Sequence, residues 1–92
     1  MTFEWDEKKN TENIEKHGVS FYEAQEAFQD PVRVIYKDIK HSIIEERLYC
    51  IGKTENGILT TRYTNRNGNI RIFGAGYWRQ QKKIYETENN LH

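Results

Sequence analysis

The sequence has little of what small secreted or membrane proteins rely on. Cys50 is the only cysteine among 92 residues, so no internal disulfide can form, whereas secreted domains of this size usually contain several cysteines. No apolar run approaches the roughly 18 residues that a membrane-spanning helix needs. Residues 1–10 are charged and lack the apolar stretch of a signal peptide. We therefore expect a single cytoplasmic domain over residues 1–92, with no membrane segment.

Motifs for common metals and cofactors are also missing. The histidines are His17, His41 and His92, and no two of them have the i, i+4 spacing of a helical metal site. The segment Gly74-Ala75-Gly76 is too short for a glycine-rich phosphate loop. Cys50 lies in the middle of a predicted strand, which is more typical of a small core residue than of a nucleophile. The sequence therefore predicts no metal and no cofactor.

The chain has no net charge, but its charges are unevenly distributed. Residues 1–46 contain 6 Lys/Arg and 11 Asp/Glu, a balance of −5, whereas residues 47–92 contain 8 and 3, a balance of +5. A basic half indicates a polyanionic partner such as nucleic acid. The alternative is that the two halves neutralise each other within the fold. Aromatic residues make up 13% of the chain, which is enough for a small core because each ring buries a large apolar area.

Capping signals predict two helices in the acidic half. Asp6 is the expected N-cap of a helix that runs to about His17 and ends at Gly18. A Ser-x-x-Glu capping box at Ser20 begins a second helix of about ten residues, which ends before Pro31. The first helix is mostly polar, so we expect it to lie on the surface with few contacts.

Alternating apolar and polar residues predict strands in the rest of the chain. Five segments follow this pattern: residues 3–5, 32–36, 46–53, 58–65 and 69–75. Asn-Gly turns join the last three into hairpins, and a basic helix is predicted near residues 78–87. These elements predict an α+β domain: a small antiparallel meander sheet with two helices before it and one after it, all packed on one face.

The basic strands contain the first candidate site. Arg62 and Arg66 are expected on one face of a strand, with Arg71 across the hairpin, so their guanidiniums could bind phosphate oxygens. The segment Tyr77-Trp78-Arg79 follows directly. Aromatic rings beside positive charge are typical of single-stranded RNA recognition, because bases stack on the rings while cations bind phosphates. The alternative is an ordinary solvated strand face.

His41 is the second candidate. It lies in a polar loop before the basic strands, and Arg47 follows within the same stretch. An imidazole can exchange protons with the 2′-hydroxyl or the leaving 5′-oxygen during metal-free RNA cleavage. The alternative is an exposed loop histidine. A stripe on the first helix, from Lys9 to His17, could add charge to a cleft, but a solvated polar face is the simpler interpretation.

Segments along nearly the whole chain, about residues 3–86, carry a family resemblance. They are Phe3-Glu4-Trp5-Asp6 with Lys9 and Asn13; Lys16-His17-Gly18-Val19-Ser20-Phe21 with Glu23-Ala24; Phe28-x-Asp30-Pro31; Asp38 with His41-Ser42 and Glu45-Glu46-Arg47; Ile51-Gly52; and Tyr63-Thr64-x-Arg66 with Ile70-Arg71-Ile72. Single pieces are common, but their ordered combination is specific. Together they resemble the BrnT family of toxins from bacterial type II toxin–antitoxin pairs.

The resemblance implies a RelE-like fold and a ribonuclease that arrests translation by cleaving RNA without a metal or another cofactor. It also implies a dimeric, DNA-binding antitoxin similar to BrnA, in a 2:2 complex with the toxin. Together with the residue patterns, it gives the expected catalytic residues, which are His41, Arg47, Arg66 and Arg71. The expected RNA-binding residues are Lys9, His17, Arg62, Tyr77, Trp78 and Arg79.

One segment departs from the family pattern. Many members end the last strand with Ile-Ser-Ala-Arg, whereas this chain has Phe73-Gly74-Ala75-Gly76, with glycine replacing both serine and arginine. Three hypotheses therefore stay open: a ribonuclease toxin, a nucleic-acid-binding module without chemistry, and a toxin relative that keeps only its antitoxin contact. The first predicts that RNA cleavage is lost when His41, Arg66 or Arg71 is changed to alanine.

Overall fold

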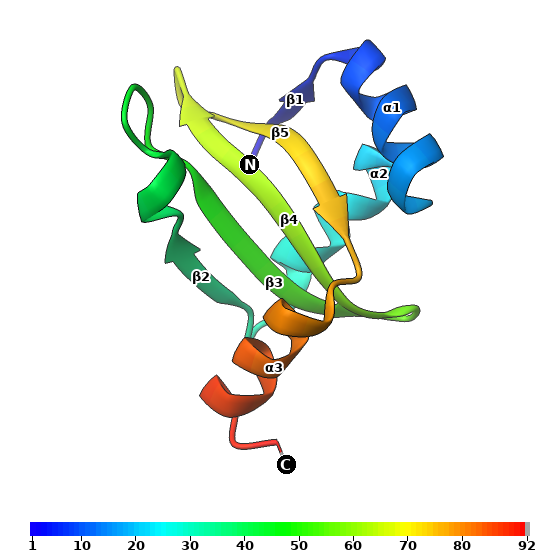
Figure 1. Ribbon diagram of the computed structural model, residues 1–92, viewed down its shortest axis with the longest axis vertical. Helices are drawn as coiled ribbons and strands as arrows, with labels where there is room; N and C mark the ends of the chain where they lie inside the picture. The colour runs from blue at the N-terminus through cyan, green and yellow to red at the C-terminus, as the bar shows by residue number, and fades with distance from the viewer. Residues whose placement is uncertain (92) are drawn as a thin grey trace.

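A five-stranded sheet organises the chain in the computed structural model, which describes residues 1–91 (Figure 1). The strands are β1 (Phe3–Trp5), β2 (Val34–Lys37), β3 (Leu48–Thr54), β4 (Gly57–Arg66) and β5 (Asn69–Gly76). The α-helices are α1 (Glu7–His17), α2 (Phe21–Ala24) and α3 (Arg79–Glu88), with 3-10 turns η1 (Gln25–Gln29) and η2 (Ile39–His41). The predicted α+β class is therefore confirmed. No helix in the described part is long and apolar enough to cross a membrane.

The predicted caps and hairpins are confirmed. The Asp6 side chain accepts a hydrogen bond from the Lys8 amide at the start of α1, and Gly18 ends this helix in the left-handed conformation with φ 70°. Strands β3, β4 and β5 lie within two residues of their predicted bounds. Asn67 and Gly68 both have positive φ at the β4–β5 turn, as a tight hairpin turn requires.

The sheet is mixed, so the prediction of a purely antiparallel meander is wrong for one strand. β2 to β5 form the expected antiparallel meander, but β1 joins the far edge parallel to β5, in the order β1-β5-β4-β3-β2. Alternation correctly places Phe3 and Trp5 on the core side of the sheet. The Phe3 ring packs against that of Phe28 with 5.2 Å between centroids, and the Trp5 ring packs against that of Phe21 with 6.1 Å between centroids. Alternation indicates which residues face the core, but it does not indicate which strand becomes the neighbour or in which direction.

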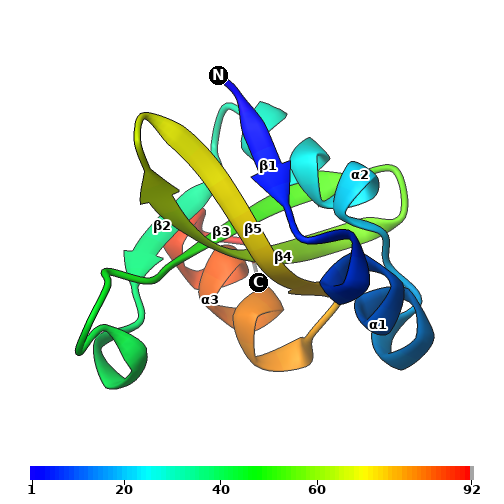
Figure 2. The same cartoon turned by 90° about the horizontal axis from the view of Figure 1, so that it is seen from above.

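Helices cover both faces of the sheet, which corrects the prediction that all pack on one face. α2 and η1 pack on the face that presents Cys50, Leu59 and Tyr63, and α3 lies across the opposite face (Figure 2). Ile51 and Thr60 point toward that opposite face and are completely buried. Their burial needs a second cover, which the C-terminal helix provides over only part of the face. The uncovered part becomes the floor of the pocket described below.

The second helix is shorter than predicted. The segment from Ser20 to Asp30 is helical as expected, but its α-helical pattern ends at Ala24 and continues as the 3-10 turn η1. The Ala24 carbonyl accepts a buried hydrogen bond of 2.7 Å from the Thr61 hydroxyl of β4. The Ala24 carbonyl, at the end of the α-helical turn, therefore bonds to the sheet. The 3-10 geometry of η1 begins at the next residue.

The core confirms the structural interpretation of the lone cysteine. Cys50 is fully buried between strands and the helical segment, and burial raises the pKa of its thiol to about 12. A thiol held neutral in this way is a poor nucleophile. Cys50 therefore contributes packing, and the chemistry of the molecule must lie elsewhere.

Candidate functional site

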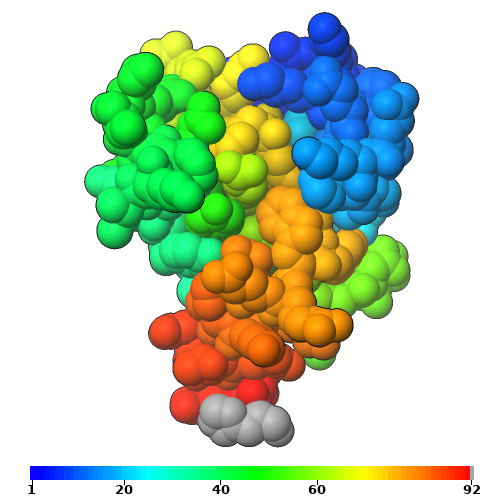
Figure 3. Space-filling view, in the orientation of Figure 1, coloured from blue at the N-terminus to red at the C-terminus, as the bar shows by residue number. Residues whose placement is uncertain are grey.

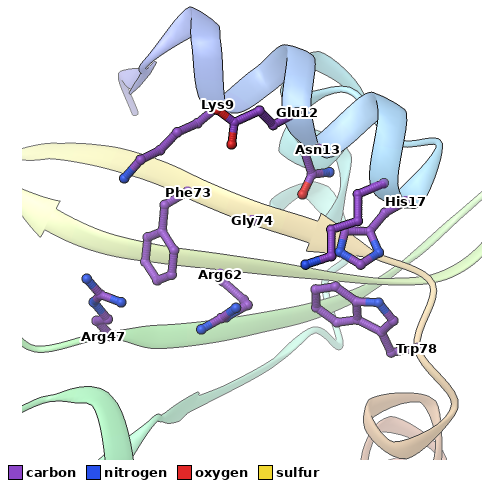
Figure 4. Close-up of a pocket in the computed structure, with 10 residues that line it drawn as sticks. Lys9, Glu12, Asn13, His17, Arg47, Arg62, Phe73, Gly74 and Trp78 are labelled. Carbon is purple, nitrogen blue, oxygen red and sulfur yellow. The ribbon is translucent and has the colours of Figure 1, made fainter.

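A polar pocket of about 260 Å³ opens on the uncovered part of the sheet, beside α1. Figure 3 shows its surroundings: loop 38–47 and α1 stand on either side of strands β4 and β5. Its lining, most of which Figure 4 labels, comprises Lys9, Glu12, Asn13, Lys16, His17, Arg47, Arg62, Phe73, Gly74 and Trp78. The pocket thus unites the first helix, three strands or strand ends and the residue before α3.

Two buried asparagines hold α1 as one wall of this pocket. The Asn13 amide donates to the carbonyls of Val19 and Ala75 at 2.8 and 2.9 Å, and its oxygen accepts from the Ala75 amide at 3.2 Å. The Asn10 side chain accepts from the Phe21 amide at 2.8 Å. Buried side-chain amides whose hydrogen bonds are all formed hold a helix rigidly, because breaking those bonds would leave polar groups unpaired and away from water. Asn13 therefore does not belong to a solvated face, whereas Lys9, Lys16 and His17 of the same stripe are exposed along the pocket.

The pocket concentrates cations that form no salt bridge within the described residues. Salt bridges among residues 1–91 involve Lys37, His41, Arg66 and Arg71. The pocket cations Lys9, Lys16, Arg47 and Arg62 are not among them, and Glu12 is the one acidic residue in the lining. Clustered cations without internal partners form a site for an anion.

Arg62 is the central cation. Its side chain rises from β4, with the guanidinium 5.1 Å from the Phe73 ring centre and 5.8 Å from that of Tyr49. Its Nε is buried and has no hydrogen-bond partner in the described part of the chain. Arg47 approaches the same Phe73 ring at 4.7 Å, so this ring lies between the two guanidiniums (Figure 4). Cation–π contacts fix both groups while leaving their donors free for a ligand.

Trp78 closes the other end of the pocket. Its indole meets the His17 ring edge-to-face, with 5.2 Å between centroids (Figure 4). The two rings come from the residue before α3 and from the last turn of α1, so this contact joins segments 61 residues apart in the chain (from 17 to 78). An imidazole and an indole at the edge of a cationic pocket provide a proton-exchanging group and a stacking surface.

The predicted arginines Arg66 and Arg71 lie in a second, smaller pocket and are already paired. Arg66 binds Glu45 through two nitrogens at 2.9 and 3.1 Å, and Arg71 binds Glu4 at 2.8 Å. The Arg66 hydrogen bond lowers the pKa of Glu45. The pKa of Glu4 is also lowered, mainly by the hydrogen bond from Asn69 and, to a smaller extent, by the one from Arg71. The smaller pocket, of about 50 Å³, shares three residues with the first pocket: Lys9, Arg47 and Phe73. The two arginines therefore extend the basic surface without belonging to its centre.

His41 is not brought into the pocket. Its Nδ1 lies 2.9 Å from the Asp38 carboxylate within loop 38–47. Burial alone would raise the pKa of Asp38, but the hydrogen bond and charge of His41 outweigh burial and leave that pKa below its usual value. The contact between His41 and Asp38 stabilises the loop, because Asp38 is buried at the base of the loop. His17 is the histidine that faces the cations.

Tyr77 and Arg79 also lie apart from the main pocket. The Tyr77 hydroxyl donates to Glu23 and lies 3.0 Å from the Thr54 hydroxyl. Burial, followed by the contact with Glu23, raises the pKa of Tyr77. Arg79 begins α3 and lines a different hollow with Tyr77 and Trp78. Of the expected RNA-binding residues, the structure gathers Lys9, His17, Arg62 and Trp78, together with Arg47 from the expected catalytic set.

Comparison with known protein families gives one match over most of the chain. Residues 5–82 match the family described as the ribonuclease toxin, BrnT, of type II toxin–antitoxin systems. The match spans most of the chain. The chain belongs to the BrnT family. No curated protein matches it closely enough to serve as a relative.

Of the two glycines expected to depart from the family pattern, Gly76 has a structural explanation. A Cβ at Gly76 would lie 2.4 Å from Cε2 of Trp78, which is closer than side chains approach, so the indole packs directly on the Gly76 backbone. A Cβ at Gly74 would lie 3.4 Å from Cδ of Arg62, which is a tolerable contact with a flexible arm. In this BrnT toxin, Trp78 fills the space above residue 76 at the end of the last strand.

Gly76→Ala is therefore expected to displace Trp78 and destabilise the fold by about 1–2 kcal/mol, the usual effect of overpacking. The indole N–H resonance of Trp78 in an NMR spectrum should shift, whereas that of Trp5 should stay in place. Gly74→Ala is the matched control and should leave both resonances near their wild-type positions. An unchanged Trp78 resonance in Gly76→Ala would show that the indole does not rest on this glycine.

Proposed function

We propose that this chain is an active endoribonuclease toxin that cleaves RNA in the pocket between α1 and the sheet. The observation that carries the proposal is the set of pocket cations, Arg62 at its centre, that form no salt bridge within the described residues. RNA supplies the phosphate oxygens that such a site needs. Membership of a ribonuclease toxin family supports the same substrate.

The proposed reaction needs no metal. The 2′-hydroxyl of a bound nucleotide attacks its own 3′-phosphorus, giving a 2′,3′-cyclic phosphate and a released 5′-hydroxyl. Arg62, Arg47 and Lys16 would bind the phosphate oxygens, on which negative charge grows in the transition state. Glu12 and His17 are the lining residues able to exchange protons: one removes the 2′ proton and the other protonates the leaving 5′-oxygen. Trp78 would stack on a neighbouring base.

This assignment favours His17 over His41 as the proton-exchanging histidine, and the two variants separate them. His17→Ala should lower the RNA cleavage rate about a hundredfold, a typical loss for a general acid or base. His41→Ala should change the rate less than about fivefold, because its ring contacts Asp38 outside the pocket. Rates come from single-turnover cleavage of a fluorescent oligonucleotide. A larger loss in His41→Ala than in His17→Ala would place the chemistry at the loop instead.

Cleavage itself is tested on the purified protein and in cells. The wild type should cut RNA in the presence of EDTA and leave cyclic phosphate ends, and its induced expression should arrest a bacterial culture with loss of intact RNA. Binding of RNA without shortening it would favour the nucleic-acid-binding module instead. Normal growth with intact RNA would favour a toxin relative that keeps only the contact with its antitoxin.

We also propose that a dimeric, DNA-binding antitoxin similar to BrnA neutralises this toxin in the cytoplasm, in a complex with two copies of each chain. The family's place in type II toxin–antitoxin systems supports an antitoxin partner. An acidic segment over the basic pocket would compete directly with RNA. Light scattering of the co-purified pair would measure the stoichiometry.

A further inference from the structure

Loop 38–47 exposes a group of large apolar side chains. Ile39, Ile43 and Ile44 are 81%, 90% and 100% exposed, which is more than any other large hydrophobic residue in the described part of the chain. Three isoleucines within six residues form a concentrated patch, and such patches mark interaction sites on soluble proteins. We refer to these three residues as the isoleucine patch.

The loop that carries the patch is fastened at its base. The Ser42 hydroxyl donates to the Asp38 carbonyl at 2.6 Å and accepts from the Arg47 amide at 3.0 Å. The Asp38 amide donates to the Arg47 carbonyl at 2.8 Å. These bonds close the loop into a fixed arch and point the isoleucines outward. A preformed apolar surface loses little entropy when it binds a partner.

The patch is continuous with the proposed RNA site. Ile43 and Ile44 line a hollow of about 330 Å³ together with Lys40, His41, Glu45 and Arg47. Arg47 also lines both basic pockets on the sheet. Figure 3 shows this loop as the wall opposite α1. A partner seated on the isoleucines would therefore reach the edge of the RNA pocket through Arg47.

The charges around the patch indicate the chemistry of that partner. Each nearby carboxylate already has a partner within the chain: Asp38 contacts His41, Glu45 pairs with Arg66 and Glu46 with Lys37. Lys40 and Arg47 form no salt bridge in the described residues. An acidic partner would complement these two cations. A second copy of this chain would instead bring like charges together.

We propose that the isoleucine patch is the docking site for an amphipathic, acidic segment of the cognate antitoxin, whose apolar side chains cover Ile43 and Ile44 while its carboxylates pair with Lys40 and Arg47. Docking there obstructs the RNA pocket at Arg47. This blocking step rests on the proposed function, whereas the docking itself does not.

The test measures antitoxin binding by calorimetry with the full-length toxin and the BrnA-like antitoxin encoded with it. The double variant Ile43→Ser/Ile44→Ser should weaken the affinity at least thirtyfold, because two exposed anchors lose their apolar burial. Lys40→Glu should weaken it about tenfold through charge repulsion. Val32→Ser is the matched control, since Val32 is an exposed apolar residue in the turn before β2, outside loop 38–47. It should bind like the wild type.

RNA cleavage by the same variants separates the inference from the proposed function. The double variant should cleave RNA at the wild-type rate but escape inhibition by antitoxin. If the wild type cleaves no RNA, the proposed function fails, and the calorimetry still decides the docking site. Affinity within twofold of wild type in the double variant would overturn the inference. So would a loss of toxin self-association in sedimentation with antitoxin binding intact, because the patch would then join two copies of this chain.

Discussion

Arg62→Gln is expected to lower the rate of RNA cleavage about a thousandfold while the protein stays folded, since removing a preorganised donor to a transition-state anion costs on the order of 10²–10³ in rate. The guanidinium of Arg62 is held between two aromatic rings and has a buried Nε without a protein acceptor. Glutamine keeps a polar group of shorter reach but removes the charge and the forked donors. The loss should therefore appear in kcat more than in KM.

The other arginines of the same sheet face provide the controls. Arg66→Gln and Arg71→Gln should each lower the rate by less than about tenfold, because their guanidiniums are already engaged by Glu45 and Glu4. Lys8→Gln controls for net charge, since Lys8 is exposed on α1 and does not line the pocket. The assay is single-turnover cleavage, with circular dichroism as the check of folding. A larger loss in Arg71→Gln than in Arg62→Gln would move the centre of the site to the smaller pocket.

Local sequence signals were sufficient to predict most elements of this fold. The Asp6 cap, the Gly18 stop and the Ser20 cap, whose hydroxyl accepts from the Glu23 amide, are each formed by residues close to one another in the chain. The Asn67-Gly68 turn likewise depends on the φ preferences of two residues. Such interactions depend only on neighbours in the chain, so the sequence predicts them without the tertiary structure.

The features of the site that could not be predicted depend on contacts between residues far apart in the chain. Arg66 and Arg71 look as free as Arg62 in the sequence, yet their partners lie 21 and 67 residues away, and only the fold brings them together. The spacing of Lys9, Asn13, Lys16 and His17 did show a shared helical stripe. Whether that stripe faces water or a pocket depended on the Asn13 contact with Ala75, 62 residues away. Polar side chains on a helix can therefore mark a buried attachment as well as a solvated face.

Asp30→Ala is expected to lower the free energy of unfolding by about 3 kcal/mol at pH 7, because it removes a buried charged acceptor from three donors. The Asp30 carboxylate accepts from the Tyr85 hydroxyl at 2.6 Å, the Lys53 amide at 2.7 Å and the Val32 amide at 2.9 Å. These donors belong to α3, to β3 and to the turn before β2. One side chain therefore ties the helix on one face to the sheet and to the end of η1 on the other.

The same carboxylate gives this stabilisation a pH dependence. Burial alone would raise the pKa of Asp30, but the hydrogen bonds from Tyr85, Lys53 and Val32 outweigh burial and hold it below its ordinary value of 3.8. A lowered folded pKa means that the stabilisation is complete above that ordinary value and is lost as the pH falls through the lower one. The difference between wild type and Asp30→Ala should therefore be constant from pH 7 to about pH 5 and shrink below about pH 4.

Urea unfolding followed by circular dichroism at several pH values measures this difference. Tyr85→Phe removes one donor and should cost about 1 kcal/mol at pH 7. Glu55→Gln, at an exposed turn residue, should stay within about 0.5 kcal/mol of wild type. A difference for Asp30→Ala that stays constant down to pH 2 would mean that the ionised carboxylate is not what joins the two layers. In that case, packing of the Tyr85 ring against the sheet would hold α3 in place. The position of α3 leaves the rest of its face of the sheet open, and that open part forms the pocket.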